Sequence, residues 1–450
     1  MPANDALTFE NGRELAWRIM RAALSAVDPY QAVKNALALD GESLLIGDTT
    51  YDLRRFKRIL VVGAGKASAP MARAVEALLG ERIAAGLINV KYGHLDTVTR
   101  ITLREAGHPM PDQSGLDGTR EIVELLENAD ETDLLLCLLS GGGSALMILP
   151  ESSISLADYQ SLTNTLLRSG ATINQINTIR KHIERVKGGR LVQLAAPATV
   201  ATLILSDVVG NPLDFIASGP TVPDTTTFED ALDVLEQFEL LDAVPSSVRD
   251  WLMRGARGSV PETPKPGDPI FERVSTVVIG GNDIASEAAL SEASALGFNA
   301  LLLTTYLEGE ARDIGKLAAA LAKELVHRAK PVEPPACLIL GGETTVTVRG
   351  AGKGGRNQEI ALAAGLALSG NERALVVALA TDGSDGPTDA AGGFADARSI
   401  QRGADAGLDA RALLARNDSN AYLSATGDLL VTGPTNTNVN DLLFVLAFPK

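Results

Sequence analysis

The stretch RILVVGAGKAS, residues 58–68, joins an apolar run to a glycine-rich turn, and residues 69–79 continue it with helical spacing. A short apolar run that ends in glycine is typical of a buried strand, and the turn leads that strand directly into a helix. The same order of strand, glycine turn and helix recurs along the chain. This pattern predicts an α/β fold in which a mostly parallel sheet is covered by helices.

Strand-like and helix-like runs alternate on both sides of this stretch. Helical periodicity covers residues 13–26, 69–79, 115–126, 285–296, 311–329 and 357–368. Strand-like runs cover residues 58–62, 85–90, 101–105, 134–139, 199–205, 274–279, 300–304, 337–340, 344–348, 375–380 and 442–446. In open α/β sheets ligands bind beyond the carboxyl ends of the strands, so the residues that follow each strand are the candidates for chemistry.

A proline-rich segment divides the chain. Residues 258–269 hold four prolines, which is typical of a linker, and a chain of 450 residues fits two or three domains of about 150 residues each. We expect an N-terminal Rossmann-like domain at residues 1–265, with a mostly parallel sheet and helices on both faces. A second α/β domain is expected at residues 270–450.

The composition excludes several classes of partner. The chain has 40 Lys and Arg residues against 56 Asp and Glu residues, and a net charge of −16 opposes binding to nucleic acid or to an anionic membrane surface. No apolar run approaches the roughly 20 residues that span a bilayer, and residues 1–5 do not resemble a signal peptide. Cys137 and Cys337 lie in apolar runs and are expected to be reduced core residues, which favours a cytoplasmic protein.

Cations on glycine-rich turns are the clearest sign of an anion site. Lys66 lies on the turn of the opening stretch, at the expected start of a helix, where backbone N–H groups and the helix dipole favour anions. Lys353 and Arg356 lie on a second glycine-rich loop before another expected helix. The loop SGGGS, residues 140–144, follows a wholly apolar run, and its glycines allow the backbone N–H groups to form a nest for an anion.

Carboxylates also follow the predicted strands, at Asp207, Glu343, Asp382 and Asp385. Because the chain has only 2 Cys and 4 His, a metal held here would be Mg²⁺ rather than zinc. For each acid taken singly, a role as a turn or helix cap is equally consistent with its position. Together, the cations and carboxylates favour phosphoryl transfer from a magnesium-bound nucleotide.

Other chemistries fit these turns less well. The turn at residues 63–68 matches the dinucleotide pattern G-x-G-x-x-G except that Ser68 replaces the last glycine, so the match is weak. No G-x-S-x-G elbow surrounds Ser140 or Ser144, which disfavours a catalytic serine.

Two further features leave alternatives open. His108 lies on a predicted loop, where it either touches a ligand or stabilises a turn. The basic segment at residues 180–190 is either a solvated helix face or a helix end close to an anionic ligand. Residue pattern alone does not decide between these interpretations.

With these residues the sequence resembles the type II glycerate kinases, also called glycerate 2-kinases, whose C-terminal region is the MOFRL domain. The resemblance covers nearly the whole chain. The motifs that carry it are VGAGKAS (62–68), GHP (107–109), LSGGGSAL (139–146), RKH (180–182), SDVVGNP (206–212), SGPT (218–221), GGETTV (341–346), GGRNQE (354–359), TDGSDGPT (381–388) and TNVND (437–441).

The resemblance implies ATP- and divalent-metal-dependent phosphorylation of D-glycerate at its 2-hydroxyl, giving 2-phosphoglycerate and ADP, in a cleft between the two domains. It implies that Lys66 and Arg356 are catalytic cations, and it makes Asp207 the candidate for orienting or deprotonating the hydroxyl. Mg²⁺ is expected at Asp382 and Asp385. The residues expected to hold the nucleotide are Ser140, Gly141, Gly142, Gly143, Ser144, Asn211 and Lys353.

Two other functions stay open at this point. A hydroxypyruvate reductase would bind NAD(P)H at the first glycine turn, and members of the family have carried that name. A metabolite-sensing module would bind ligands without turning them over. The expected partners are the small molecules D-glycerate and ATP, with neither nucleic acid nor membrane, and a homodimer is one candidate assembly.

Overall fold

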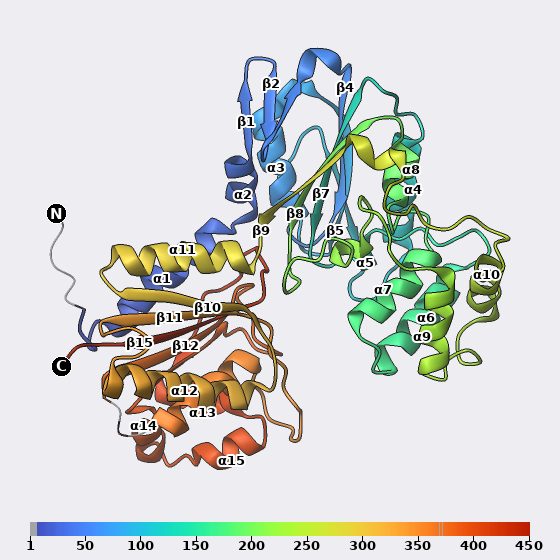
Figure 1. The fold of residues 1–450 in the computed structure, drawn as a ribbon. Coiled ribbons are helices and arrows are strands. Elements are labelled where there is room, and N and C mark those ends of the chain that lie inside the picture. Colours follow the sequence, from blue (N-terminus) through green and yellow to red (C-terminus); the bar gives the residue numbers. More distant parts are fainter. Residues whose placement is uncertain (1–6, 369, 371) are drawn as a thin grey trace. The chain divides into compact units, whose positions relative to one another are not determined.

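The strand of the opening stretch lies inside a six-stranded sheet in the computed structural model, which describes residues 7–368, 370 and 372–450 (Figure 1). This sheet belongs to the compact unit formed by residues 29–279, named here the parallel-sheet unit. In order across the sheet, its strands are β6 (Thr102–Ala106), β5 (Ile83–Lys91), β4 (Arg58–Ala64), β7 (Asp133–Ser140), β8 (Thr199–Leu205) and β9 (Val274–Gly280).

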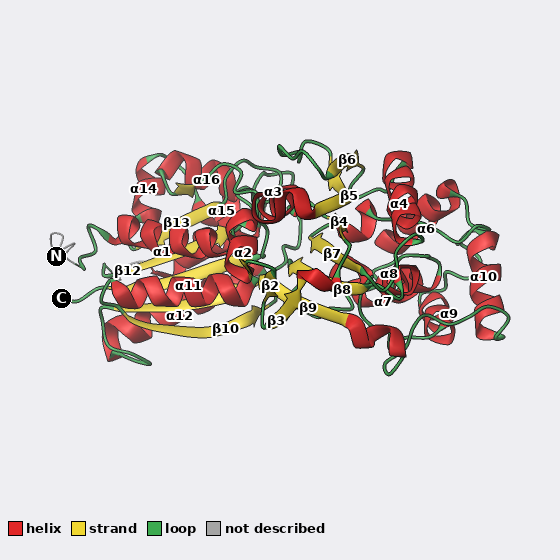
Figure 2. Cartoon of the chain, turned by 90° about the horizontal axis from the view of Figure 1, so that it is seen from above, coloured by secondary structure: helices red, strands yellow, loops and turns green. Residues whose placement is uncertain are grey.

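Each neighbouring pair from β6 to β8 runs parallel, which confirms the prediction of a mostly parallel sheet. All eight residues of β7 are buried, because a central parallel strand is covered on both faces and needs a continuous apolar run. Figures 1 and 2 show α3 (Ser68–Leu79) on one face of this sheet and α4 (Gln113–Leu126) on the other.

The remaining elements of the parallel-sheet unit surround this sheet. Strands β1 (Leu37–Asp40), β2 (Ser43–Ile46) and β3 (Thr49–Asp52) form a small antiparallel sheet. The other helices are α2 (Pro29–Ala36), α5 (Gly143–Leu146), α6 (Leu156–Arg168), α7 (Ile173–His182), α8 (Arg190–Ala195), α9 (Phe228–Gln237) and α10 (Ser246–Ala256), with short 3₁₀ turns η1 (Leu53–Arg55), η2 (Gly80–Arg82), η3 (Ile216–Ser218) and η4 (Pro269–Arg273).

A second compact unit, named here the mixed-sheet unit, comprises residues 280–450 and the segment that ends at Asp28. In order across its sheet, the strands are β10 (Asn299–Leu307), β11 (Ala336–Gly342), β15 (Asp441–Ala447), β12 (Ala374–Ala380), β13 (Gly392–Asp396) and β14 (Leu429–Leu430). The helices are α1 (Gly12–Ala26), α11 (Asn282–Ala295), α12 (Ala311–Arg328), α13 (Arg356–Leu368), α14 (Ser399–Asp405), α15 (Ala410–Ala415) and α16 (Ser419–Thr426).

The last strand of the chain determines the layout of this second sheet. β15 lies between β11 and β12 and runs antiparallel to both, so its first residue, Asp441, pairs with Gly342 at the end of β11 and with Ala380 at the end of β12. Figure 1 shows α1 and α11 on one face of the sheet and α12 and α13 on the other. The last residues of β11 and β12 and the first residue of β15 therefore lie at the same end of the sheet, because β15 runs opposite to its two neighbours.

Small residues allow the helices of the mixed-sheet unit to pack closely. Ala318, Ala319 and Ala364 are buried in its core. A Cβ atom on Gly315 of α12 would lie 2.5 Å from the carbonyl oxygen of Ile360 on α13, so only glycine permits this approach of the two helices.

The structure differs from the predicted elements at three places. Strand β9, expected to open the second domain, pairs into the first sheet, so the division between the units falls at residue 279 rather than in the proline-rich segment. Helix α1, expected in the first domain, packs on α11 in the mixed-sheet unit. Residues 344–348 do not form the expected strand, because within them only Thr345 makes an isolated bridge, to Glu310.

The sequence predictions about membrane spans, cysteines and a signal peptide can be compared with the structure. Within the described residues, no helix is long and apolar enough to cross a membrane. Cys137 and Cys337 are buried free thiols, as predicted, and burial raises the pKa of each to about 12. The signal-peptide prediction concerns residues 1–5, which lie outside the described residues.

We expect Leu136→Ala to lower the free energy of unfolding of the parallel-sheet unit by about 2–5 kcal/mol, because Leu136 is fully buried in β7 and its truncation leaves a cavity. Urea denaturation followed by circular dichroism measures the change. The matched control is Leu167→Ala, at a leucine that is 54% exposed, and it should shift stability by less than about 0.5 kcal/mol. Similar losses in the two variants would contradict the central position of β7.

Candidate active site

Two glycine turns interlock at the carboxyl ends of β4 and β7. The backbone N–H of Lys66 donates to the carbonyl oxygen of Gly141 at 2.9 Å, and the N–H of Ala67 donates to Oγ of Ser140 at 3.0 Å. Gly65 has a φ of +150°, and a Cβ there would lie 2.0 Å from Ser140 Oγ. Only glycine fits this position, so the two turns hold each other at a fixed spacing.

Three chemically active side chains lie around the second turn. A Cβ atom on Gly142 would lie 3.0 Å from Cδ2 of His108 and 3.3 Å from Cε of Lys66, while one on Gly141 would lie 2.1 Å from Oδ2 of Asp207. Because these two positions are glycine, the loop backbone lies directly against the imidazole of His108, the side chain of Lys66 and the carboxylate of Asp207. The structure places Lys66 and Asp207, both predicted site residues, beside the same loop, Ser140–Ser144.

The serines of this loop have structural partners. Ser140 Oγ lies 3.0 Å from Ser68 Oγ, and Ser144 Oγ lies 2.8 Å from Ser218 Oγ. Ser218 Oγ donates in turn to Oδ1 of Asn177 on α7 at 3.0 Å. Within the part of the chain that the structure describes, neither Ser140 nor Ser144 donates a hydrogen bond to a histidine. This arrangement disfavours a catalytic serine.

His108 is held in its neutral form. Burial first, and then the positive charges of Lys66, Lys91 and Arg180, together lower its pKa to about 4. At neutral pH the ring therefore offers one N–H donor and one nitrogen acceptor. Sequence reasoning left His108 between a ligand contact and a turn role, and its place beside Gly142 favours the ligand contact.

The basic segment that ends α7 is not a solvated face. Lys181 is 1% exposed and lies 3.2 Å from Asp214 and 3.3 Å from Asp224. His182 and Lys187 are fully buried as well, with carboxylate partners at Glu262 and Glu184. All three side chains are buried against carboxylates, so the solvated-face interpretation is wrong for these residues.

Arg356, in the mixed-sheet unit, is the first residue of α13 and is fixed by two carboxylates. Its Nη1 donates to Glu343 at 2.7 Å and its Nη2 to Asp441 Oδ1 at 3.1 Å, while Nε lies 2.6 Å from Asp441 Oδ2. Burial raises the pKa of Asp441 to about 7, although Arg356 acts in the opposite direction. The side chain of Arg356 remains 30% exposed, which leaves guanidinium N–H groups for an anion.

The two carboxylates predicted to hold a metal, Asp382 and Asp385, have different surroundings. Both carboxylate oxygens of Asp385 accept hydrogen bonds at the start of α13, from the backbone and side-chain nitrogens of Asn357 and Gln358 at 2.9–3.2 Å. Asp382 Oδ1 accepts from the backbone N–H of Ser384 at 3.0 Å. Across the described residues, no cluster of three or more His, Cys, Asp or Glu side chains could hold a metal ion. Asp385 is a helix cap, and its filled oxygens do not fit a metal ligand.

Lys353 lies exposed on the loop before α13. Its backbone N–H donates to Asp418 Oδ1 at 3.1 Å, and the backbone N–H groups of Arg349 and Gly350 donate to Oδ1 of the buried Asn417. Asn417 thus holds the loop that carries Lys353. The sequence pattern did not indicate this role of Asn417.

Asn211, the remaining predicted nucleotide residue, lies in a turn after β8 with a φ of +52°, and its N–H donates to Val208 O at 3.0 Å. Its predicted contact with a nucleotide stays a prediction. Sequence reasoning did not assign Asp441, the carboxylate that contacts Arg356, although the TNVND motif at residues 437–441 contained it. Its place beside Arg356 depends on the antiparallel insertion of β15, which local pattern does not reveal.

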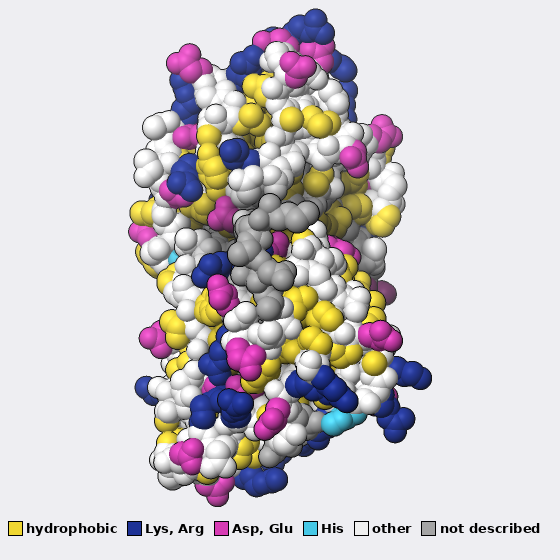
Figure 3. Space-filling model, turned by 90° about the vertical axis from the view of Figure 1, so that its left-hand side faces the viewer, with side chains coloured by type: hydrophobic (Ala, Val, Ile, Leu, Met, Phe, Trp, Pro, Cys, Tyr) yellow, Lys and Arg dark blue, Asp and Glu magenta, His cyan; other side chains and the backbone are white. Residues whose placement is uncertain are grey.

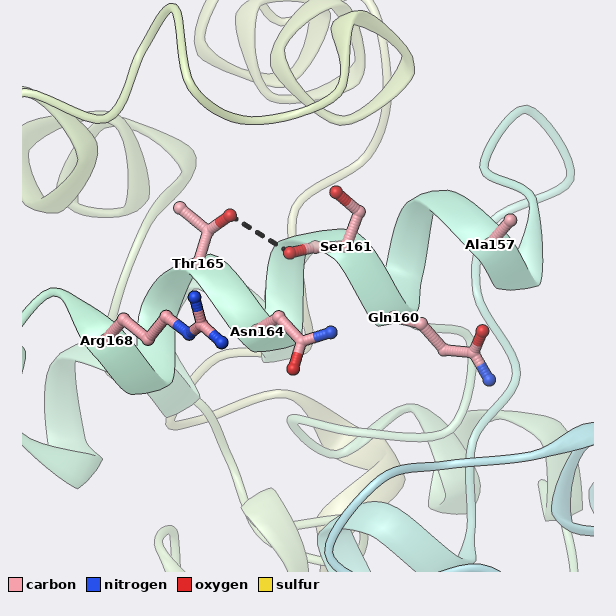
Figure 4. A pocket seen from close by; sticks show the side chains of 6 residues that line it. All are labelled: Ala157, Gln160, Ser161, Asn164, Thr165 and Arg168. Carbon is pink, nitrogen blue, oxygen red and sulfur yellow. Dashed lines mark hydrogen bonds between the residues drawn. The ribbon is translucent and has the colours of Figure 1, made fainter.

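A shallow depression elsewhere on the parallel-sheet unit carries none of these residues. It is lined only by one side of α6, as Figure 4 shows, and Thr165 there uses its hydroxyl to bond the carbonyl of Ser161 in the preceding turn. A surface formed by one helix does not enclose a ligand, so this depression is not the candidate site.

Two family models match the chain. One, described as "Domain of unknown function (DUF4147)", matches residues 15–253, and the other, described as "MOFRL family", matches residues 336–441. A glycerate 2-kinase from Pyrococcus horikoshii is 45% identical over 97% of this chain and 98% of its own length. A crystal structure of a glycerate kinase from Thermotoga maritima has a TM-score of 0.87 and 42% identity, covering 97% of this chain and 100% of that one.

A further relative, from Agrobacterium vitis, is provisionally named a hydroxypyruvate reductase and is 40% identical over 97% of this chain and 94% of its own length. The likeness to these proteins extends over both units. By family model, by sequence and by fold, the chain belongs to the glycerate 2-kinase family, with a DUF4147 domain followed by a MOFRL domain.

Proposed function

We propose that this protein is a glycerate 2-kinase that transfers the γ-phosphoryl group of ATP to the 2-hydroxyl of D-glycerate. The observation that carries the proposal is the full-length likeness to a glycerate 2-kinase at 45% identity, together with a fold shared with a glycerate kinase. In this proposal the glycines of the SGGGS loop provide backbone N–H groups for the phosphates, because the N–H groups of Lys66 and Ala67 are already donated to that loop. Phosphoryl transfer depends on positioning and on neutralising charge, which cations on such turns provide.

In the parallel-sheet unit, we assign the nest at Ser140–Ser144 to phosphate oxygens and Lys66 to the charge that develops on the transferring group. During transfer, the 2-hydroxyl oxygen forms a bond to the γ-phosphorus, the bond to the bridging oxygen breaks, and ADP leaves. The hydroxyl proton passes to a carboxylate, which we assign to Asp207 because it lies against Gly141.

In the mixed-sheet unit, Arg356 is the second catalytic cation of the proposal. Its carboxylate partners, Glu343 and Asp441, fix the orientation of the guanidinium before an anion arrives, so little reorganisation is needed when charge develops. Lys353 and Asn211 remain assigned to the nucleotide.

A magnesium ion is expected with the nucleotide, because Mg²⁺ in such enzymes is held mostly by phosphates, water and one or two carboxylates. Asp382 is the remaining candidate for such a carboxylate, while Asp385 does not fit. The dimer stays a prediction. The cytoplasmic location also stays a prediction, supported by two buried, free cysteines.

The reductase is the second candidate function, favoured only by the name of the Agrobacterium vitis relative. A dinucleotide turn needs a third glycine for close packing of the helix on the strand. Here Ser68 takes that place, and its hydroxyl lies 3.0 Å from Ser140 Oγ inside the core. This arrangement favours the kinase.

Purified protein with ATP, MgCl₂ and D-glycerate should form ADP and 2-phosphoglycerate. Phosphorus NMR separates the 2-phospho from the 3-phospho isomer, and a parallel sample with hydroxypyruvate and NADH measures reductase activity. Formation of the 3-phospho isomer alone would overturn the proposed regiochemistry. Oxidation of NADH without ATP would favour the reductase.

We expect Lys66→Ala and Arg356→Ala each to lower kcat by about 10²–10³-fold, because each removes a cation that stabilises the transferring group. Initial rates at saturating ATP and D-glycerate measure the loss. Lys316→Ala, at an exposed lysine of α12, is the matched control and should retain wild-type kcat. Turnover at the wild-type rate by either variant would refute its assignment.

The pKa of about 4 at His108 predicts a specific acid response. Because the folded protein disfavours the protonated ring, which faces Lys66, Lys91, His94 and Arg180, this group contributes stability above pH 6.5 that is lost as the pH falls toward 4. As the pH falls from 6.5 to 4.5, the Tm of the His108→Asn variant should therefore fall less than the Tm of the wild-type protein. Differential scanning fluorimetry measures both values. The corresponding difference in the free energy of unfolding should stay below about 3 kcal/mol, since water screens the charge of a half-buried group. Parallel curves for the two proteins would contradict a neutral His108.

A further inference from the structure

Arg180, in the last turn of α7, is a buried cation without a counter-ion. It is only 8% exposed, its Nε is buried without a hydrogen-bond partner, and its guanidinium makes no ion pair among the described residues. Other arginines with a buried Nε each reach a carboxylate: Arg190 pairs with Glu151 at 2.7 Å, Arg312 with Glu359 at 3.0 Å and Arg402 with Asp428 at 2.6 Å. Arg180 differs from them in this respect.

An uncompensated charge in a protein interior is costly, because water that would solvate it has been removed. Neighbouring Lys181 and Lys187 avoid this cost through carboxylate partners. A bound anion would supply the missing partner and remove this cost. The burial of Arg180 therefore points to an anion that binds there.

The position of Arg180 connects it to the glycine turn. Asn177 and Arg180 are three residues apart on α7 and so lie on one face of the helix. Through that face, Asn177 accepts from Ser218, whose hydroxyl lies 2.8 Å from that of Ser144 in the SGGGS loop. The positive charges of Arg180 and Lys66 both act on His108, which contacts the same loop at Gly142.

We propose that Arg180 binds the carboxylate group of the hydroxy-acid substrate. A guanidinium presents a planar pair of N–H donors that matches a carboxylate in bidentate geometry. The neutral imidazole of His108 and the carboxylate of Asp207 lie at the same turn and supply hydrogen-bond partners for hydroxyl groups. A cation beside two hydroxyl-binding groups fits a small 2-hydroxy acid, whereas the nest and Lys66 are assigned to phosphates. The identity of the acid as D-glycerate rests on the proposed function.

The test uses Arg180→Met, which keeps most of the side-chain length and removes the charge. In the ligand-free protein we expect Tm to rise by at least about 2 °C, because an unpaired buried charge is gone. The stabilisation of the protein by D-glycerate, measured by thermal shift without nucleotide, should disappear. KM for D-glycerate should rise on the order of 100-fold while KM for ATP stays within about twofold.

Controls separate this role from others. Arg185→Met, at a guanidinium 42% exposed in the same segment, should leave both thermal shift and KM unchanged. Glyceramide, which lacks the carboxylate charge, should bind wild type and Arg180→Met equally. Arg180→Lys should recover part of the D-glycerate affinity, and it serves as the primary test if Arg180→Met does not fold, with a loss of about tenfold in D-glycerate affinity expected and ATP unaffected.

Three results would overturn the proposal. A lower Tm with D-glycerate binding intact would make Arg180 a structural residue. A loss of ATP affinity with D-glycerate binding intact would assign Arg180 to the nucleotide phosphates. Unchanged binding of both ligands in either variant would remove it from the site. Because the thermal shift needs no turnover, loss of D-glycerate binding in a protein without kinase activity would support Arg180 while refuting the proposed function.

Discussion

The contact between the turns after β4 and β7 is the constraint on which the candidate site depends. Gly65 permits the close approach to Ser140, and hydrogen bonds from Lys66 and Ala67 join the two turns. Adjacent parallel strands place their carboxyl ends at one edge of a sheet, so two loops distant in sequence meet there. The fold thereby converts a repeated local pattern into a single surface with a cation, an imidazole and a carboxylate.

A different topology leads to a similar arrangement in the mixed-sheet unit. There β15 runs antiparallel between β11 and β12, so its first residue, rather than its last, lies at the edge where β11 and β12 end. Asp441 thus faces the first residue of α13, and the ion pair with Arg356 ties the helix to the sheet. Asp385 binds the backbone of the same helix start. The carboxylates at this edge therefore stabilise a helix end and orient a cation.

Local patterns in the sequence were sufficient for most of the fold and part of the site. The strand before Gly63 and the helix after it need only their own residues, and both formed as predicted. The placement of Asp441 required a pairing between segments about 100 residues apart, and the assignment of β9 required knowledge of its neighbour β8. Asp385 was expected to bind a metal because strand-end carboxylates commonly do. The proximity of α13, a tertiary feature, made it a helix cap instead.

The contrast between the arginines shows how an acidic protein maintains positive sites. On the face drawn in Figure 3, acidic and basic side chains are interspersed, although the chain as a whole has a net charge of −16. Arg356 is held by carboxylates, which fix its direction at the expense of part of its charge. Arg180 makes no ion pair with any residue that the structure describes, and its buried charge carries a cost in stability. Pairing suits a cation that must be oriented, and isolation suits one that must bind an anion strongly, which is the usual opposition between stability and function at binding sites.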